Sequence, residues 1–71
     1  MAKIVINRLK IVLAEKNMTN RVLAQKLGVA ETTVSRWVTN DKQPSVETFY
    51  NIAVLLDINL RELFVSTKPK L

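Results

Sequence analysis

The 71-residue sequence predicts an all-α fold, a compact bundle of five helices. In segment after segment, apolar residues recur at the i, i+3 and i+4 spacing of a buried helix face. Short stretches rich in turn-forming residues separate these segments. The length suits one domain, and 48% hydrophobic residues with one glycine and two prolines exclude the disordered and collagen-like classes.

The composition also limits the chemistry available to the chain. It contains neither cysteine nor histidine, which removes disulfides, the commonest zinc ligands and the usual general base. We therefore expect no catalytic residues, no metal site, no cofactor and no enzymatic activity. Eleven Lys and Arg residues against six Asp and Glu residues leave a net charge of +5. This charge favours a polyanionic partner such as nucleic acid, although many small domains are basic for solubility alone.

The N-terminal stretch has no apolar run long enough for a signal peptide or a membrane span, so we expect a cytoplasmic protein with no membrane partner. The first helix is expected over residues 4–16. The apolar residues expected to face the core are Ile6, Leu9, Val12 and Leu13 on this helix and Met18 after the following turn. Three further apolar residues make this helix more apolar than a single buried face requires: Ile4, Val5 and Ile11. They either add to the core or cover the C-terminal helix or a second subunit.

Two short helices joined by a tight turn form the centre of the chain. Thr19 is expected to cap the first of them, and Gly28 to end it in a left-handed conformation. Val29 is expected to point inward. The buried faces comprise Leu23, Ala24 and Leu27 on the first helix and Val34, Trp37 and Val38 on the second, which spans about residues 31–39. This pattern predicts a helix-turn-helix.

The remaining elements follow from turn and capping residues. Residues 39–44 read as a turn, with Asn40 suited to a left-handed position. Ser45 is expected to cap a fourth helix that ends at Asp57, with the core stripe Phe49, Ile52, Ala53 and Leu56. A capping box formed by Asn59 and Glu62 opens a short fifth helix. We expect the domain to span residues 1–65 and a loose basic tail to span residues 66–71.

The chain resembles the lambda-repressor and Cro-like (Xre-type) DNA-binding domains. Their pattern T-x-x-x-L-A-x-x-L-G-V-x-x-x-T-V-S-x-W is met by residues 19–37. The resemblance continues through residues 44–48 and 59–63, and it covers about residues 4–65. Two departures are visible: Leu13 and Val38 stand where the family often has an Arg–Glu ion pair, and Asn40 stands where it usually has glycine. Replacing both members of a buried ion pair strands no charge, so the fold prediction is unaffected.

The resemblance implies that the third helix reads DNA bases. At about 100° per residue, the direction opposite its apolar face is occupied by Thr32, Arg36 and Thr39, and the N-terminal residues of such a helix approach base edges. The predicted base-reading residues are Glu31, Thr32, Ser35 and Arg36. Arg36 either pairs with guanine O6 and N7 or contacts phosphate. Glu31 either accepts from cytosine N4, or holds Arg36, or stabilises the helix N-terminus.

Contacts to the DNA backbone are implied at the start of the second helix and in the loop after the third. The matching residues are Thr19, Asn20, Arg21, Thr33, Thr39, Asn40, Lys42 and Gln43. The alternatives are that Asn20 is simply a polar first-turn residue and that the loop is only solvated.

The sequence thus favours a sequence-specific regulator of transcription that binds double-stranded DNA, with its recognition helix in the major groove of a palindromic operator. We expect a repressor, a homodimer and no small-molecule ligand. The residues suggested for the dimer interface are Tyr50, Val54, Leu60 and Phe64. The alternative is a protein-interaction module, such as an antitoxin or an accessory subunit, that uses the same fold.

Overall fold

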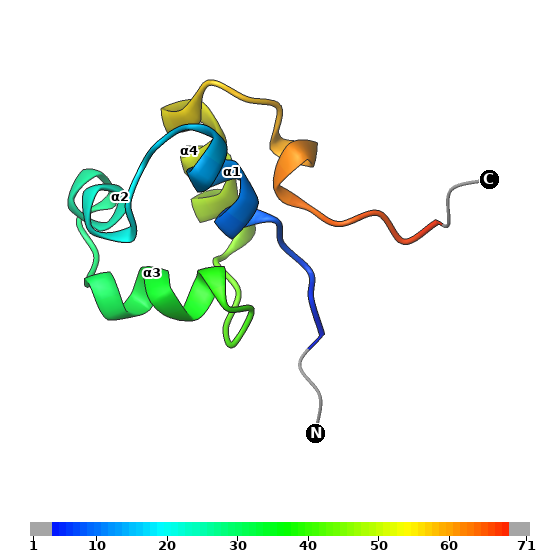
Figure 1. Cartoon of the computed structure of the whole chain (residues 1–71), viewed down its shortest axis with the longest axis horizontal. Helices are drawn as coiled ribbons and strands as arrows, with labels where there is room; N and C mark the ends of the chain where they lie inside the picture. Colours follow the sequence, from blue (N-terminus) through cyan, green and yellow to red (C-terminus); the bar gives the residue numbers. More distant parts are fainter. Residues whose placement is uncertain (1–3, 69–71) are drawn as a thin grey trace.

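The computed structural model describes residues 4–68, and it contains four α-helices followed by one short 3-10 helix (Figure 1). These elements are α1 (Leu9–Glu15), α2 (Asn20–Leu27), α3 (Glu31–Val38), α4 (Val46–Leu56) and η1 (Leu60–Leu63). Within the described residues the only β-type pairing is an isolated antiparallel bridge between Asn7 and Phe64. The all-α class is confirmed. The expected fifth helix is a four-residue 3-10 turn, because the extended backbone of Phe64 ends it.

The first helix begins five residues later than expected. Residues 4–8 lie outside it, and Ile4 and Ile6 are 75% and 40% exposed. Ile11 is exposed as well. The prediction that Ile6 points inward was therefore wrong. Of the two alternatives for Ile4, Val5 and Ile11, the exposure of all three excludes an addition to the core.

Pairing between the two ends of the chain explains the late start of α1. The Val65 N–H donates to the Ile6 carbonyl at 2.9 Å, and the Arg8 N–H donates to the Leu63 carbonyl at 2.8 Å. These bonds hold the N-terminal segment extended, a conformation that the β-branched run at residues 4–6 favours. Asn7 then accepts a hydrogen bond from the Leu9 N–H, where the helix starts.

The core lies where all the elements meet. Five side chains are completely buried, one from each element: Leu9, Leu23, Val34, Ile52 and Leu63. The expected core stripe of α4 is confirmed in full, and Met18, Leu27 and Val38 pack against the core. Val29 is the exception. It is 36% exposed, because the chain has already turned outward where its N–H donates to the Ala24 carbonyl.

The predicted helix ends at Thr19, Gly28, Ser45 and Asp57 are confirmed, and so is the capping box of Asn59 and Glu62. The Thr19 hydroxyl accepts from the Val22 N–H at 3.1 Å, and Ser45 caps α4 in the same way. Gly28 ends α2 at φ 71° with open space where a Cβ would lie, so the backbone conformation alone favours glycine there.

The arrangement leaves α3 at one edge of the molecule (Figure 1). It packs against α2 and, to a smaller extent, against α1. The short helix η1 packs on α4 and α1. The ring centroids of Phe49 and Phe64 lie 4.7 Å apart. The predicted tail is exposed at residues 66–68, while residues 69–71 lie outside the described part of the chain.

Candidate nucleic-acid interface

The two central helices are held as one unit by buried side chains and by the turn between them. Leu23 and Ala24 on α2 are buried together with Val34 and Trp37 on α3. Ala24 is small, which allows the two helix backbones to approach closely. The orientation of α3 is therefore set by the core rather than by its own exposed residues.

The outer face of α3 carries the predicted base-reading residues. Glu31, Thr32 and Arg36 are exposed, and Ser35 is half-buried beside them. At helical periodicity these four lie on the side away from the buried Val34 and Trp37. The structure thus brings together the whole set that the sequence predicted on one surface.

The N-terminal end of α3 has no side-chain cap. Ala30 occupies the cap position, and its carbonyl accepts from the N–H groups of Thr33 and Val34 at 3.0 and 3.3 Å. The first N–H groups of a helix have no partner within the helix. Here no side chain from the cap residue occupies them, so the end of the helix nearest to the predicted base-reading residues remains available to an anion.

The start of α2 offers further donors. The Thr19 oxygen accepts the capping bond, which leaves its own O–H free to donate. Arg21 is exposed and Asn20 is half-buried. All three predicted backbone contacts in this region therefore lie at one helix terminus.

The loop after α3 uses many of its polar groups internally. The Thr39 hydroxyl lies within hydrogen-bond distance of the carbonyls of Ser35 and Arg36, at 3.1 and 3.2 Å. The Arg36 carbonyl also accepts from the N–H groups of Asp41 and Lys42. The Lys42 side chain is exposed, whereas Thr33, on α3 itself, is half-buried.

Asn40 and Gln43 bond to each other and to the N-terminal segment. The Asn40 Oδ1 accepts from the N–H groups of Ile6 and Asn7 at 2.9 and 3.0 Å and from Gln43 Nε2 at 3.0 Å. The Asn7 Nδ2 donates to the Trp37 carbonyl and to Gln43 Oε1, at 2.9 and 2.7 Å. The left-handed conformation predicted for Asn40 is confirmed, at φ 60°.

Sequence reasoning missed Asn7, which is only 3% exposed. The available signal was an asparagine two residues before the first fully buried leucine, because asparagine favours the position just before a helix over its interior. Its partners Trp37 and Gln43 lie 30 and 36 residues away along the chain, so the sequence offered no local indication of them.

Comparison with known proteins agrees with this geometry. The helix-turn-helix family model matches residues 9–63, which is more than half of the chain. The chain belongs to the lambda-repressor-like (Xre-type) helix-turn-helix family. None of the curated proteins matches it.

A solved structure of similar sequence supports the same assignment. It is the crystal structure of a "putative DNA-binding protein" from Bacteroides fragilis, with 45% sequence identity and a TM-score of 0.84. The match covers 87% of this chain and 100% of the other. A helix-turn-helix domain of this family thus occupies nearly all of the chain.

The residues suggested for a dimer interface divide into two groups in this helix-turn-helix domain. Tyr50 and Val54 on α4 are 59% and 63% exposed. Leu60 and Phe64 are half-buried against the core, which leaves less of their surface for a partner.

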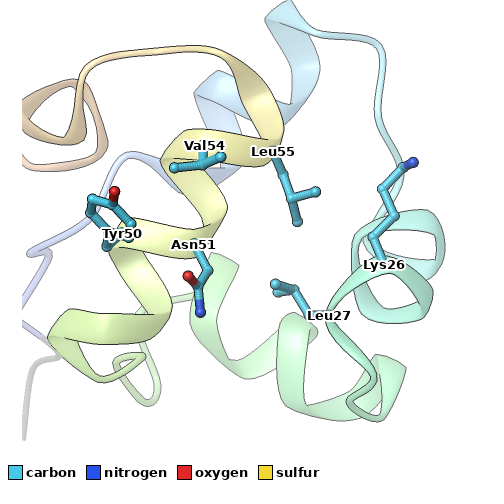
Figure 2. A pocket seen from close by; sticks show the side chains of 6 residues that line it. All are labelled: Lys26, Leu27, Tyr50, Asn51, Val54 and Leu55. Atoms are coloured by element: carbon cyan, nitrogen blue, oxygen red, sulfur yellow. The ribbon is translucent and has the colours of Figure 1, made fainter.

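An open groove of about 450 Å³ runs between α2 and α4 of the domain (Figure 2). Its lining consists of Lys26, Leu27, Tyr50, Asn51, Val54 and Leu55. Figure 2 shows Leu27 and Leu55 on facing sides of the groove. Among the described residues there is no cluster of acidic side chains fit to hold a metal ion. None of the helices in residues 4–68 has the length and hydropathy needed to cross a bilayer.

Proposed function

We propose that the protein is a transcriptional repressor that binds a palindromic operator in double-stranded DNA as a homodimer. The observation that carries this proposal is the polar outer face of α3, with Glu31, Thr32 and Arg36 exposed on a helix whose opposite side is buried. A helix held in this way can enter the major groove with its N-terminal residues at base edges.

Specificity is assigned chiefly to Arg36 and Thr32. The guanidinium of Arg36 can donate two parallel hydrogen bonds to O6 and N7 of guanine. Thr32 offers a hydroxyl to a base edge and a methyl group to thymine. Glu31 and Ser35 flank them, and Glu31 suits a cytosine N4 because its carboxylate is an acceptor only.

Affinity is assigned to the DNA backbone. Two exposed basic residues belong to the predicted backbone contacts: Arg21 at the start of α2 and Lys42 in the loop after α3. The start of α2 adds donors at Thr19 and Asn20. The predicted set also holds Thr33, Thr39, Asn40 and Gln43, of which the last three already bond within the protein. If each of these two cations neutralises one phosphate, the slope of log K against log salt is about −1.8 per protomer.

A dimer follows from the amount of sequence that one helix can read. One recognition helix covers only a few base pairs, so two half-sites about 34–36 Å apart provide useful specificity. The face proposed for self-association is the exposed stripe of Val46, Tyr50 and Val54 along α4, at i, i+4 and i+8. α4 has a single charged residue, Glu47, which is unusual for a helix that water would cover on one side.

Self-association is tested by sedimentation of Val54→Glu beside Ile11→Glu. Both replace an exposed apolar side chain by a carboxylate, but Ile11 lies on α1. We expect Val54→Glu to sediment as a monomer and to bind a palindrome weakly, and Ile11→Glu to behave as wild type. A wild-type monomer that binds a palindrome one to one would contradict the dimer.

DNA binding is tested by selecting random duplexes and titrating the winner at two salt concentrations. A palindromic winner, a steep salt dependence and loss of preference at one base pair in Arg36→Ala would support the proposal. Repression itself is then tested with the selected site placed over a promoter. No enriched sequence, or indifference to changes at Arg36 and Thr32, would favour the protein-interaction alternative.

Two surface features favour that alternative, the groove between α2 and α4 and the exposed apolar stripe on α4. A module such as an antitoxin or an accessory subunit would use this surface for a different protein. It predicts weak DNA binding without sequence preference, with a wild-type chain that does not self-associate.

A further inference from the structure

Three amide side chains join the loop after α3 to the start of the chain. We refer to Asn7, Asn40 and Gln43 as the amide clamp. Asn7 is almost completely buried, and its Nδ2 lies 2.7 Å from Gln43 Oε1, while Gln43 Nε2 lies 3.0 Å from Asn40 Oδ1. The Asn40 Nδ2 in turn donates to the Asn7 carbonyl at 3.3 Å.

The hydrogen bonds of the amide clamp are mutually consistent. Each nitrogen faces an acceptor and each oxygen faces a donor, so one orientation of all three amides satisfies every contact. The Asn40 Oδ1 alone accepts three bonds. In residues 4–68 no buried side-chain polar atom lacks a partner. A fully satisfied network of this kind favours a single conformation of the loop.

Both sides of the amide clamp are themselves fixed. On the loop side, the Asp41 and Lys42 N–H groups donate to the Arg36 carbonyl at 2.9 and 3.1 Å, at the last turn of α3. On the other side, Ile6 is bonded to Val65, so the clamp is tied to the paired ends of the chain. The backbone of Lys42, between the two clamp residues of the loop, is thereby held in place.

We propose that Asn40 and Gln43 are positioning residues for DNA binding, which hold Lys42 against a phosphate through the amide clamp. This inference rests on the proposed DNA-binding function. A loop that is already ordered loses little conformational freedom when it binds. The alternative is direct contact, since each NH₂ group of Asn40 and Gln43 has a second hydrogen that could reach a phosphate.

The first experiment tests the clamp without DNA. Asn40→Gly keeps the left-handed turn that glycine tolerates and removes every side-chain bond. Amide hydrogen exchange at Ile6 and Asn7 should become about three- to tenfold faster, as expected for the loss of one hydrogen bond of ordinary strength. The matched control is Asn17→Gly, at an exposed position with φ 54°, which should leave both rates unchanged.

The second experiment uses the salt dependence of DNA binding. A neutral amide releases no counterion, so a direct contact by Asn40 would not change the salt slope. If Asn40 positions Lys42, Asn40→Gly alone should reduce the slope by up to about 1 per protomer. Lys42→Ala should cause a similar reduction in the wild type and no further reduction in the Asn40→Gly background.

The outcomes separate this inference from the proposed function. An unchanged salt slope in Asn40→Gly, with losses that multiply with those of Lys42→Ala, would overturn positioning while leaving DNA binding intact. Wild type without any DNA affinity would overturn both, and exchange at Ile6 and Asn7 would still show whether the clamp exists. If Asn40→Gly does not fold, Gln43→Ala replaces it, because this change removes two hydrogen bonds of the amide clamp. Its effect is measured by the same salt dependence of DNA binding.

Discussion

The two ends of the recognition helix α3 are built in opposite ways. At its N-terminal end, Ala30 provides no side-chain cap, and the exposed Glu31 and Thr32 follow directly. At its C-terminal end, the Trp37 carbonyl accepts from Asn7 Nδ2 and from the Asn40 N–H. The comparison shows that one end holds the helix in place and the other is left open. The hydrogen bonds that fix the helix are accepted by backbone carbonyls near its C-terminal end, including those of Ser35 and Arg36. They leave the side chains of Glu31, Thr32 and Arg36 exposed.

The largest effect, a loss of stability, is expected from removing hydrogen bonds at the C-terminal end of α3. Asn7→Leu removes one of the two hydrogen bonds to the Trp37 carbonyl and the side-chain partners of Gln43 Oε1 and the Leu9 N–H. Since an unsatisfied buried polar group costs about 1–3 kcal/mol, we expect the free energy of unfolding to fall by about 3 kcal/mol. Urea denaturation followed by circular dichroism measures the change.

A matched control for this change is Asn51→Leu, at an exposed position on α4. Its free energy of unfolding should stay within about 0.5 kcal/mol of the wild type. If Asn7→Leu were as mild as the control, the network at the C-terminal end would not hold the helix.

The second-largest effect is expected for DNA recognition by the outer face of α3. Arg36→Ala should weaken discrimination at one base pair by about 1–3 kcal/mol, because the proposed pair of hydrogen bonds to guanine is lost. Stability should hardly change, since the side chain is exposed. Competition between the selected operator and its single-base variants measures the change. A uniform loss of affinity over all operator variants would instead assign Arg36 to a phosphate contact. The control is Lys10→Ala on α1, which should leave the discrimination unchanged.

A smaller effect, a gain in stability, should follow from adding a side-chain cap at the N-terminal end of α3. Ala30→Ser supplies the missing cap and should raise the free energy of unfolding by about 1 kcal/mol, equivalent to about 4–8 °C in Tm for a domain of this size. Differential scanning calorimetry tests this. Ala14→Ser, at an exposed position within α1, should give no increase. An unchanged Tm in Ala30→Ser would mean that other groups already satisfy the end of α3.

The smallest effect is expected at Thr39, at the fixed end. Thr39→Val keeps the branched shape and removes the hydroxyl that bonds to the carbonyls of Ser35 and Arg36. We expect a loss of about 0.5 kcal/mol in stability, and DNA affinity within about twofold of the wild type because a hydroxyl bonded to the helix is not a strong phosphate donor. A tenfold loss of affinity without loss of stability would restore Thr39 as a backbone contact.

The outer face of α3 was predictable, and the hydrogen-bond network at its C-terminal end was not. Glu31, Thr32 and Arg36 follow from periodicity, since the buried Val34 and Trp37 define the opposite side. The polar loop residues Asn40 and Gln43 have the composition of a solvated turn, and nothing near them in the sequence indicates Asn7 as a partner. Residue type alone does not separate a side chain that bonds to phosphate from one that bonds across the fold.

The sequence by itself determined the helix faces, most of the caps and the turn at Gly28, because these depend on spacings of three or four residues and on local backbone preferences. Only the tertiary structure decided where α1 begins, how short η1 is and what Asn7, Asn40 and Gln43 do. These features depend on hydrogen bonds between residues at least 30 positions apart. Helical periodicity at residues 4–6 was overridden because their backbone pairs with the other end of the chain and with Asn40.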